Sequence, residues 1–178
     1  MWCPFNLTEE QQNVEGLKLH LACGSIYLND WVNVDLDNKT ADVQADVSNL
    51  DTFSDNSADL ILASHVIEHF PEEKVLPVLK EWYRVIKPGY WVIIECPDFQ
   101  ADIENFLKIP RDDIHQRIAQ FPQIFGRPDW HPLQTHLCGL WHEYLETRLK
   151  EAGFKKTVRM EPRKDGIEHL CMRVDALK

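Results

Sequence analysis

The chain has 178 residues, is 44% hydrophobic and 27% charged, and carries a formal net charge of −10 at pH 7. This size and composition are typical of one ordinary globular domain with a hydrophobic core of its own. The acidic balance disfavours nucleic acid as a partner, and no apolar run approaches the about 18 residues that a membrane span needs.

The first half of the chain alternates short apolar segments with turns. Thr8 and Gln11 have the spacing of a capping box, which predicts a short helix that ends at Gly16. Only ten positions separate Leu21 from Val32, close to the minimum of about 10–12 for a crossover, so a helix there can have one or two turns at most. The predicted strands of this half cover residues 17–21, 31–36, 41–47 and 59–64.

The second half contains longer elements and one irregular stretch. Pro71 begins a helix whose apolar residues share one face until residues 87–89 end it. Residues 98–138 hold two short amphipathic segments and then several prolines, which predicts an insertion that covers a site as a lid. The other predicted elements are a strand over 90–95, a helix over 141–152 closed by Gly153, and an antiparallel pair of strands over 154–160 and 168–174.

The alternation of strand, helix and strand predicts an α/β fold. Such a pattern is typical of a doubly wound, mostly parallel sheet with helices on both faces. We expect one domain over residues 1–178, with the lid-like insertion at 98–138 as its one large addition.

The run from Leu17 to Ser25 and the acid Asp35 together predict a binding site for an adenosine group. Gly24 lets a ligand approach the backbone closely, and a carboxylate at the tip of the next strand is well placed for ribose hydroxyls. A dinucleotide fingerprint would need three glycines, but the matching positions hold Ala22, Gly24 and Ile26. The chain also lacks a G-K-[ST] phosphate loop, so an adenosine ligand without phosphates fits better.

Four motifs occur in an order that resembles a known family. They are residues 20–25, 34–36, 45–47 and 59–69, with further matches at 82–89 and 149–154. The chain resembles the class I, Rossmann-like S-adenosylmethionine-dependent methyltransferases, in particular the broad group of small predicted methyltransferases. The resemblance implies a seven-stranded, mostly parallel sheet with an antiparallel terminal strand, and S-adenosyl-L-methionine as the cofactor.

The resemblance also implies which residues contact the cofactor. Asp35 would accept hydrogen bonds from the ribose, Asp46 would meet the adenine amino group, and the turn after the first strand would approach the methionine part. His20 and Ala22 stand where the family usually has an acid and a glycine. The full set of expected cofactor-binding residues is His20, Ala22, Cys23, Gly24, Ser25, Asp35, Leu36, Asp46, Val47, Ser64 and His65.

Four residues are candidates for catalysis at the acceptor side: His65, Glu68, His69 and His136. A histidine near its ordinary pKa of about 6.5 can deprotonate a hydroxyl or an amine. Alternatively, Glu68 and His69 hydrogen-bond the loop backbone, and His136 caps the helix that follows it. We expect a small-molecule or sugar acceptor.

Two other functions remain open. His65, Glu68 and His69 also spell H-x-x-E-H, an inverted zinc-peptidase motif, but that motif needs a long helix and only a single turn is available here. The second alternative is a binding module that keeps S-adenosylmethionine and has lost turnover. Our main expectation involves no metal.

The remaining expectations concern location and assembly. The five cysteines are scattered and never form C-x-x-C, and the N-terminus has neither the basic start nor the apolar core of a signal peptide. We therefore expect a cytoplasmic protein without a membrane partner. The apparently exposed aromatic residues Trp2, Phe5 and Trp130 are compatible with either a monomer or a homodimer.

Overall fold

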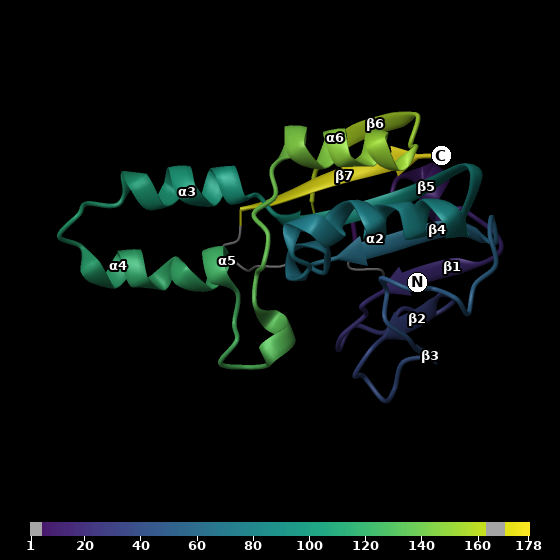
Figure 1. The fold of residues 1–178 in the computed structure, drawn as a ribbon, viewed down its shortest axis with the longest axis horizontal. Helices are drawn as coiled ribbons and strands as arrows, with labels where there is room; N and C mark the ends of the chain where they lie inside the picture. Colours follow the sequence, from purple (N-terminus) through teal and green to yellow (C-terminus); the bar gives the residue numbers. More distant parts are fainter. Residues whose placement is uncertain (1–4, 163–169) are drawn as a thin grey trace.

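A twisted sheet forms the centre of the protein, seen in a computed structural model that describes residues 5–162 and 170–178 (Figure 1). Within these residues the sheet has seven strands in the order β3-β2-β1-β4-β5-β7-β6. β7 runs antiparallel to β5 and to β6, and the other pairs are parallel. The strands are β1 Lys18–Leu21, β2 Val32–Asp35, β3 Val43–Gln44, β4 Ala58–Ser64, β5 Ile86–Pro97, β6 Lys156–Met160 and β7 Cys171–Leu177. The mostly parallel sheet with an antiparallel terminal strand is thus confirmed.

The helices largely follow the sequence pattern. The capping box is present, because Gln11 N donates to Thr8 Oγ1 at 3.2 Å and Thr8 N donates to the Gln11 side chain at 3.0 Å. α6 ends at Gly153, as predicted, and this glycine adopts the left-handed backbone conformation with φ 115. The helices are α1 Glu9–Gln12, α2 Glu72–Val85, α3 Phe99–Lys108, α4 Ile114–Ala119, α5 Phe121–Phe125 and α6 His142–Ala152, with 3-10 turns η1 Ile67–His69 and η2 Pro132–Gln134. No helix of the described residues is long and apolar enough to cross a membrane.

The larger part of the core lies between the sheet and α2 and α6, which cover one of its faces (Figure 1). β4 shows how the sequence builds it: Ile61 and Ala63 point to this face, and Leu60 and Leu62 point to the other. All four are fully buried, as expected for a strand in the middle of a parallel sheet. Trp82 of α2 is the largest side chain in this layer.

The opposite face is covered mainly by irregular chain. Phe5 and Leu28 pack there against Leu60, Leu62 and Ile93, and among the described residues α1 is the helix of this layer. The crossover from β1 to β2 forms turns without a helix, because it is too short for one. Phe5 was expected to be exposed, but it is 5% exposed because it fills the space that a crossover helix would take. Trp2 lies outside the described residues, as does the predicted start of the last strand at Glu168.

β5 begins directly after α2, whereas residues 87–89 were expected only to end the helix. Ala58 pairs with Ile86 and Leu60 pairs with Trp91, so the intervening residues of β5 bulge out of the ladder. Gly89 has φ 85 within this bulge, and Lys87 Nζ contacts both oxygens of Asp59 at 2.8 Å. The Lys-Pro-Gly sequence therefore shapes a bulged strand start rather than a loop.

The insertion begins as an arm that projects from the sheet. Helices α3, α4 and α5 extend away from the strands, and the chain then returns toward them through η2 (Figure 1). The return is held on η1, since the backbone N–H groups of Leu137 and Cys138 both donate to the carbonyl of Glu68, at 2.8 and 3.2 Å. The arm carries several exposed apolar side chains, including Leu107, Ile114 and Phe125.

Candidate active site

A cavity of about 360 Å³ lies at the carboxyl ends of β1, β2, β3 and β4. In the strand order, the chain runs outward from β1 through β2 and β3 on one side and continues from β4 on the other. The cavity thus occupies the switch point where open α/β sheets bind ligands. Its walls are formed by Ala22, Gly24, Asp35, Leu36, Asp37, Ala45, Asp46, Val47, His65, Val66, His69, Phe70, His131, Leu133 and Gln134.

Asp35 fixes the backbone of the turn after β1 by hydrogen bonding. The Asp35 carboxylate accepts hydrogen bonds from the backbone N–H groups of Gly24, Asp37 and Asn38, each at 2.9 Å. Oδ1 takes two of these and Oδ2 only one, so Oδ2 can accept a further hydrogen bond from a ligand hydroxyl. A side chain added at Gly24 would meet nothing within 4 Å, so this part of the turn faces open space.

Ala22 and Gly24 both adopt the left-handed region, with φ 52 and 53. An alanine pays about 1–2 kcal/mol in this region, which glycine avoids. The alanine in the first motif therefore keeps a glycine-like backbone shape at a modest energetic cost.

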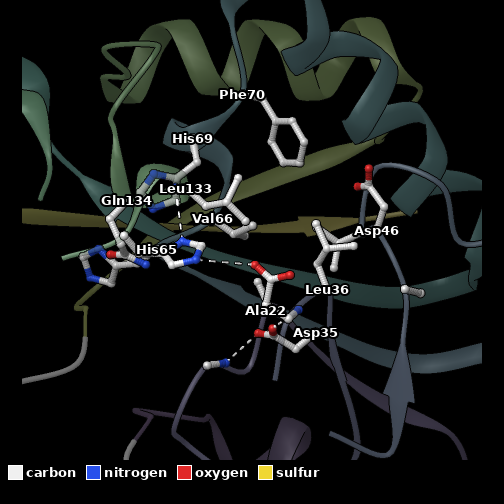
Figure 2. A pocket seen from close by; sticks show the side chains of 15 residues that line it. Ala22, Asp35, Leu36, Asp46, His65, Val66, His69, Phe70, Leu133 and Gln134 are labelled. Atoms are coloured by element: carbon white, nitrogen blue, oxygen red, sulfur yellow. Dashed lines mark hydrogen bonds and ion pairs between the residues drawn. The ribbon is translucent and has the colours of Figure 1, made fainter. Parts of the chain in front are cut away.

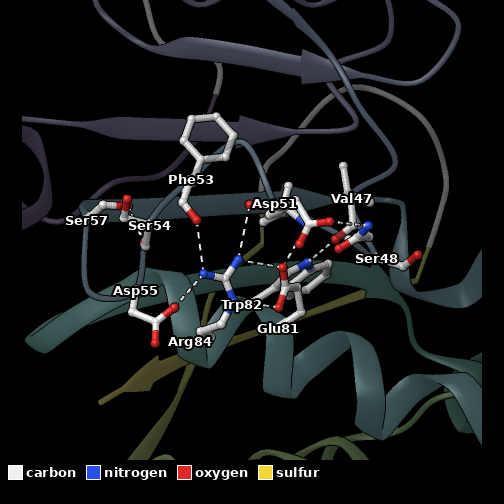
Figure 3. A network of polar contacts seen from close by, with 12 residues as sticks. Val47, Ser48, Asp51, Phe53, Ser54, Asp55, Ser57, Glu81, Trp82 and Arg84 are labelled. Carbon is white, nitrogen blue, oxygen red and sulfur yellow. Dashed lines mark hydrogen bonds and ion pairs between the residues drawn. The ribbon is translucent and has the colours of Figure 1, made fainter.

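The segment after β3 brings Asp46 and Val47 to the cavity, and α2 fixes its backbone. Asp46 Oδ1 accepts a hydrogen bond from Ser48 N at 2.8 Å. The indole Nε1 of the buried Trp82 donates to the Val47 carbonyl at 2.9 Å (Figure 3). Further along, Arg84 donates to the carbonyls of Leu50 and Phe53 at 3.1 and 3.0 Å. Asp46 thus stands on an exposed turn whose backbone is tied to a helix.

His65 follows β4 directly and adopts φ 53, which turns the chain along the cavity wall. Its Nδ1 lies 3.3 Å from Glu68 Oε1, and its Nε2 lies 3.6 Å from the Cys171 sulfur. Burial lowers the pKa of His65, but the contacts with Cys171 and with the Glu68 carboxylate outweigh it and raise this pKa. At neutral pH the His65 ring is therefore protonated, and each of its nitrogens already faces a neighbouring side chain.

Glu68 lies behind the two wall histidines, His65 and His69. Its side chain is 2% exposed, and neither carboxylate oxygen receives a hydrogen bond. Burial raises the pKa of Glu68, but His65 and then His69 outweigh this and keep it below its usual value, so the carboxylate is ionised. His136 packs against His69 with ring centroids 5.3 Å apart, and burial lowers the pKa of His136.

The returning part of the insertion closes one side of the cavity. Leu133 and Gln134 line it opposite Asp35, Leu36 and Asp46 (Figure 2), and His131 belongs to its walls as well. His131 Nε2 lies 3.8 Å from Asp37 Oδ2, so a side-chain contact links the insertion to the loop after β2.

The structure brings together most, but not all, of the expected site residues. Ala22, Gly24, Asp35, Leu36, Asp46, Val47, His65 and His69 line the cavity, and Glu68 and His136 lie behind its wall. The cavity-lining set does not include His20, Cys23, Ser25 or Ser64.

Three of these four residues, His20, Cys23 and Ser64, make contacts that support the fold. His20 is buried, with Nδ1 3.2 Å from Asn33 Oδ1, and packs edge-on against Phe5. The buried Cys23 has its sulfur 3.7 Å from the Gly24 carbonyl, and Ser64 Oγ donates to Glu95 at 3.3 Å.

The structure shows the alternative backbone contact for His69 but not the helix cap for His136. His69 Nδ1 does contact a loop carbonyl, that of Thr135, at 3.0 Å. His136 does not cap the next helix, because α6 begins at Trp141 without a side-chain cap. The H-x-x-E-H segment contains only the three-residue turn η1, which is not the long helix that a zinc peptidase needs.

Sequence reasoning missed several wall residues. Val66 and Phe70 belong to the fourth motif, and their apolar character next to His65 and His69 was a usable signal. His131 and Gln134 had no such signal, because only the path of the insertion brings them to the strand ends.

The comparisons with known proteins agree with this geometry. Residues 19–94, which include β1 to β4 and most of β5, match the family model described as a methyltransferase domain. No protein of curated function matches the sequence.

Solved structures extend the likeness over the rest of the chain. A SAM-dependent methyltransferase from Methanosarcina mazei aligns with a TM-score of 0.62 at 15% identity, over 97% of this chain and 98% of that one. A SAM-dependent methyltransferase from Archaeoglobus fulgidus gives 0.61 at 16% identity, over 92% and 86%. A possible exported protein from Bordetella parapertussis gives 0.64 at 15% identity, over 92% of this chain but only 61% of that longer one.

At these identities the solved structures show a shared fold, and the family model adds the kind of domain. The matched region carries the strand ends that form the cavity, with a carboxylate and an open glycine turn that suit an adenosine cofactor. Residues 19–94 thus match a methyltransferase domain, and the chain as a whole shares the fold of the S-adenosylmethionine-dependent methyltransferases to which it is similar.

Proposed function

We propose that the protein transfers the methyl group of S-adenosylmethionine to a small-molecule or sugar acceptor that binds beneath the insertion at 98–138. This proposal rests on one observation: residues from the strand ends and residues from the insertion line the same cavity. Asp35 and Asp46 come from strand ends, whereas His131, Leu133 and Gln134 come from the insertion. We infer that the insertion acts as a lid of a single domain, since it closes the side of the cavity away from the cofactor residues.

The cofactor supplies an activated methyl group, and the residues of the chain hold it in place. Asp35 Oδ2 would accept a ribose hydroxyl, and the free oxygen of Asp46 would accept the adenine amine. Leu36 and Val47 would pack on the purine, and the turn at 22–25 would lie along the methionine part. Of the expected contacts, those of His20, Cys23, Ser25 and Ser64 would be indirect, through the backbone that they support.

The acceptor would lie between the wall histidines and the lid. Methyl transfer is an in-line displacement in which positioning contributes most of the acceleration. His65, His69 and Gln134 border this space and would position the acceptor by contact. A small acceptor is supported by the cavity volume of about 360 Å³ and by the net charge of −10, which opposes polyanions.

We also propose that the protein works in the cytoplasm, as a monomer or homodimer. Cys23, Cys96, Cys138 and Cys171 are free thiols, which suits a reducing compartment. The exposed Trp130 and the exposed apolar side chains of the arm could form the contact surface of a homodimer.

Calorimetry with S-adenosylmethionine and S-adenosylhomocysteine tests the cofactor site. Asp35→Asn should weaken binding by about 10–150-fold, because a hydrogen bond to a charged group contributes about 1.5–3 kcal/mol. The matched control is Asp51→Asn, which makes the same charge change at an exposed position outside the cavity and should bind normally. Equal affinities in the two variants, or no binding by the wild type, would refute the proposed site.

Transfer itself is tested with S-adenosylmethionine labelled at the methyl group and a panel of sugars and small hydroxyl or amine compounds. Labelled product from a member of the panel supports the proposal. Cofactor binding without transfer to any of them favours the second candidate, a non-catalytic binding module. The observation behind this alternative is Ala22, whose strained backbone differs from the family's glycine.

A further inference from the structure

Glu68 has an unusual environment for a buried carboxylate. Its side chain is 2% exposed and both of its oxygens lack a hydrogen-bond partner. Buried carboxylates in proteins are almost always hydrogen-bonded, paired at close range or bound to a metal ion, because an unsatisfied charge is costly. His65 Nδ1 lies 3.3 Å from Oε1, but this contact leaves both oxygens without a hydrogen bond.

Two histidine nitrogens face the same carboxylate. One atom each from Glu68, His69 and His136 lie within 4.8 Å of one another. His69 Nε2 is 3.9 Å from Glu68 Oε1, whereas two ligands of one zinc ion, each bound at about 2.0–2.1 Å, lie about 3.3 Å apart. Small side-chain rotations would therefore bring the three donors to one ion.

The hydrogen bond made by His69 Nδ1 also favours an ion between these three side chains. Nδ1 lies 3.0 Å from the Thr135 carbonyl, which can only accept, so Nδ1 carries a proton. The other ring nitrogen, Nε2, is the one that can offer a lone pair to an ion, and it lies 3.9 Å from Glu68 Oε1. A cation between His69 Nε2 and the Glu68 carboxylate would satisfy both of these acceptors. In metal-bound histidines the second ring nitrogen usually donates to a carboxylate, a backbone carbonyl or water, as His69 Nδ1 does here.

The three donors are also fixed in position by the backbone. Glu68 and His69 belong to η1, and the Leu137 and Cys138 N–H groups donate to the Glu68 carbonyl. His136 N donates to the Phe125 carbonyl at 3.0 Å, which holds this residue at the end of the insertion. The donors thus come from two segments that are locked together before any ion arrives.

We propose that Glu68, His69 and His136 bind one divalent transition-metal ion of the zinc type beside the cofactor cavity. Two imidazoles and one carboxylate suit Zn²⁺ or Fe²⁺ and disfavour Mg²⁺ and Ca²⁺, which take oxygen ligands. Three protein ligands leave a coordination position open. Because His69 also lines the cavity, that position borders the space assigned to the acceptor.

This site differs from the one that the H-x-x-E-H motif suggests. There both histidines of the motif would bind the metal and the glutamate would act as a base. Here Glu68 is itself a ligand, His136 of the insertion replaces His65, and His65 Nε2 faces the Cys171 sulfur.

A consequence for catalysis depends on the proposed function. An acceptor hydroxyl bound to the open position would have a lowered pKa and would release its proton to water. Its oxygen would then bond to the methyl carbon as the methyl–sulfur bond breaks, with the electron pair left on sulfur in S-adenosylhomocysteine. The acceptor class would be a hydroxyl compound that can bind a metal, such as a vicinal diol or a hydroxy acid.

Metal binding is tested on the full chain after treatment with a chelator and dialysis. Titration with Zn²⁺ in a calorimeter should show one ion per chain, and Co²⁺ should give absorption bands of a low-coordinate nitrogen and oxygen site without thiolate charge transfer. Glu68→Gln and His136→Ala should each weaken Zn²⁺ binding at least a hundredfold. His115→Ala, on the exposed surface of α4, is the matched control and should bind as the wild type does.

Two outcomes would overturn the proposal: a wild type that binds no Zn²⁺, or binding that survives unchanged in both cluster variants. Circular dichroism confirms that each variant is folded, and Glu68→Gln keeps the side-chain size if His136→Ala disturbs the return segment. The proposed methyl transfer is judged separately, by S-adenosylmethionine binding to the metal-free protein. Cofactor binding without Zn²⁺ binding would remove only the metal site, and the reverse result would remove only the proposed cofactor site.

Discussion

Replacing Trp82 with phenylalanine tests whether α2 holds the cofactor segment in place. Trp82 is fully buried, and its Nε1 donates to the Val47 carbonyl at 2.9 Å. The phenyl ring removes that donor, and an unsatisfied carbonyl costs about 1–3 kcal/mol. The smaller ring also leaves a void, which adds roughly 1 kcal/mol.

The Trp82→Phe variant should therefore be less stable by about 2–4 kcal/mol, or roughly 10 °C in melting temperature for a chain of this size. Urea denaturation followed by circular dichroism measures the loss. At a temperature where the variant is folded, its affinity for S-adenosylmethionine should fall several-fold, because Asp46 and Val47 lose their tie to the helix.

Trp91→Phe is the matched control. Trp91 is only half-buried, and its Nε1 makes a long, exposed contact of 3.4 Å with Glu10. It should lose less than about 1 kcal/mol and bind the cofactor normally. If Trp82→Phe behaves like this control, or if it loses stability while its cofactor affinity is unchanged, the anchoring argument is wrong.

Three further substitutions probe other parts of the molecule. Burial, together with the neighbouring Asp98, raises the pKa of Asp102 from 3.8 to about 6, so the folded chain holds a proton that the unfolded chain releases between these values. Stability should fall as pH rises through that window, and Asp102→Asn should abolish the fall and raise stability at pH 7 by about 1–3 kcal/mol in pH-dependent melting. Arg173→Met should cost about 3–5 kcal/mol in urea denaturation, because the buried Asp175 loses both of its 2.7 Å contacts with Arg173. His131→Ala removes the exposed contact with Asp37, so melting should be unchanged while stopped-flow shows faster cofactor release; an unchanged release rate would contradict the lid.

The sequence allowed most of the sheet and the residues that line the cavity at the strand ends to be predicted. Strands such as Ala58–Ser64 are continuous apolar runs, and Asp35 and Asp46 follow strands, so local patterns locate them. The side of the cavity formed by the insertion could not be predicted in detail, because His131 and Gln134 reach it through contacts between distant segments. No local pattern encodes that Leu137 N bonds to the Glu68 carbonyl.

The same limit explains the errors in the fold. Lys87, Pro88 and Gly89 read as a helix stop, but pairing with β4 extends the strand through them as a bulge. Phe5 was expected to be exposed, whereas it is buried because the crossover is too short to cover its face of the sheet. In each case a tertiary contact outweighed a correct local signal.

The strain at the strand ends follows from where the cavity must be. β1 and β4 pair in parallel up to Leu21 and Ala63, and both chains turn sharply just beyond, at Ala22 and His65. Both residues adopt a left-handed backbone that costs about 1–2 kcal/mol each outside glycine. Backbone hydrogen bonds hold the two turns, from Cys23 N to Val34 O at 3.1 Å and from His65 N to Glu95 O at 2.8 Å. Because extended continuations of both strands would fill the switch point, these two strained turns keep the cavity at the switch point open.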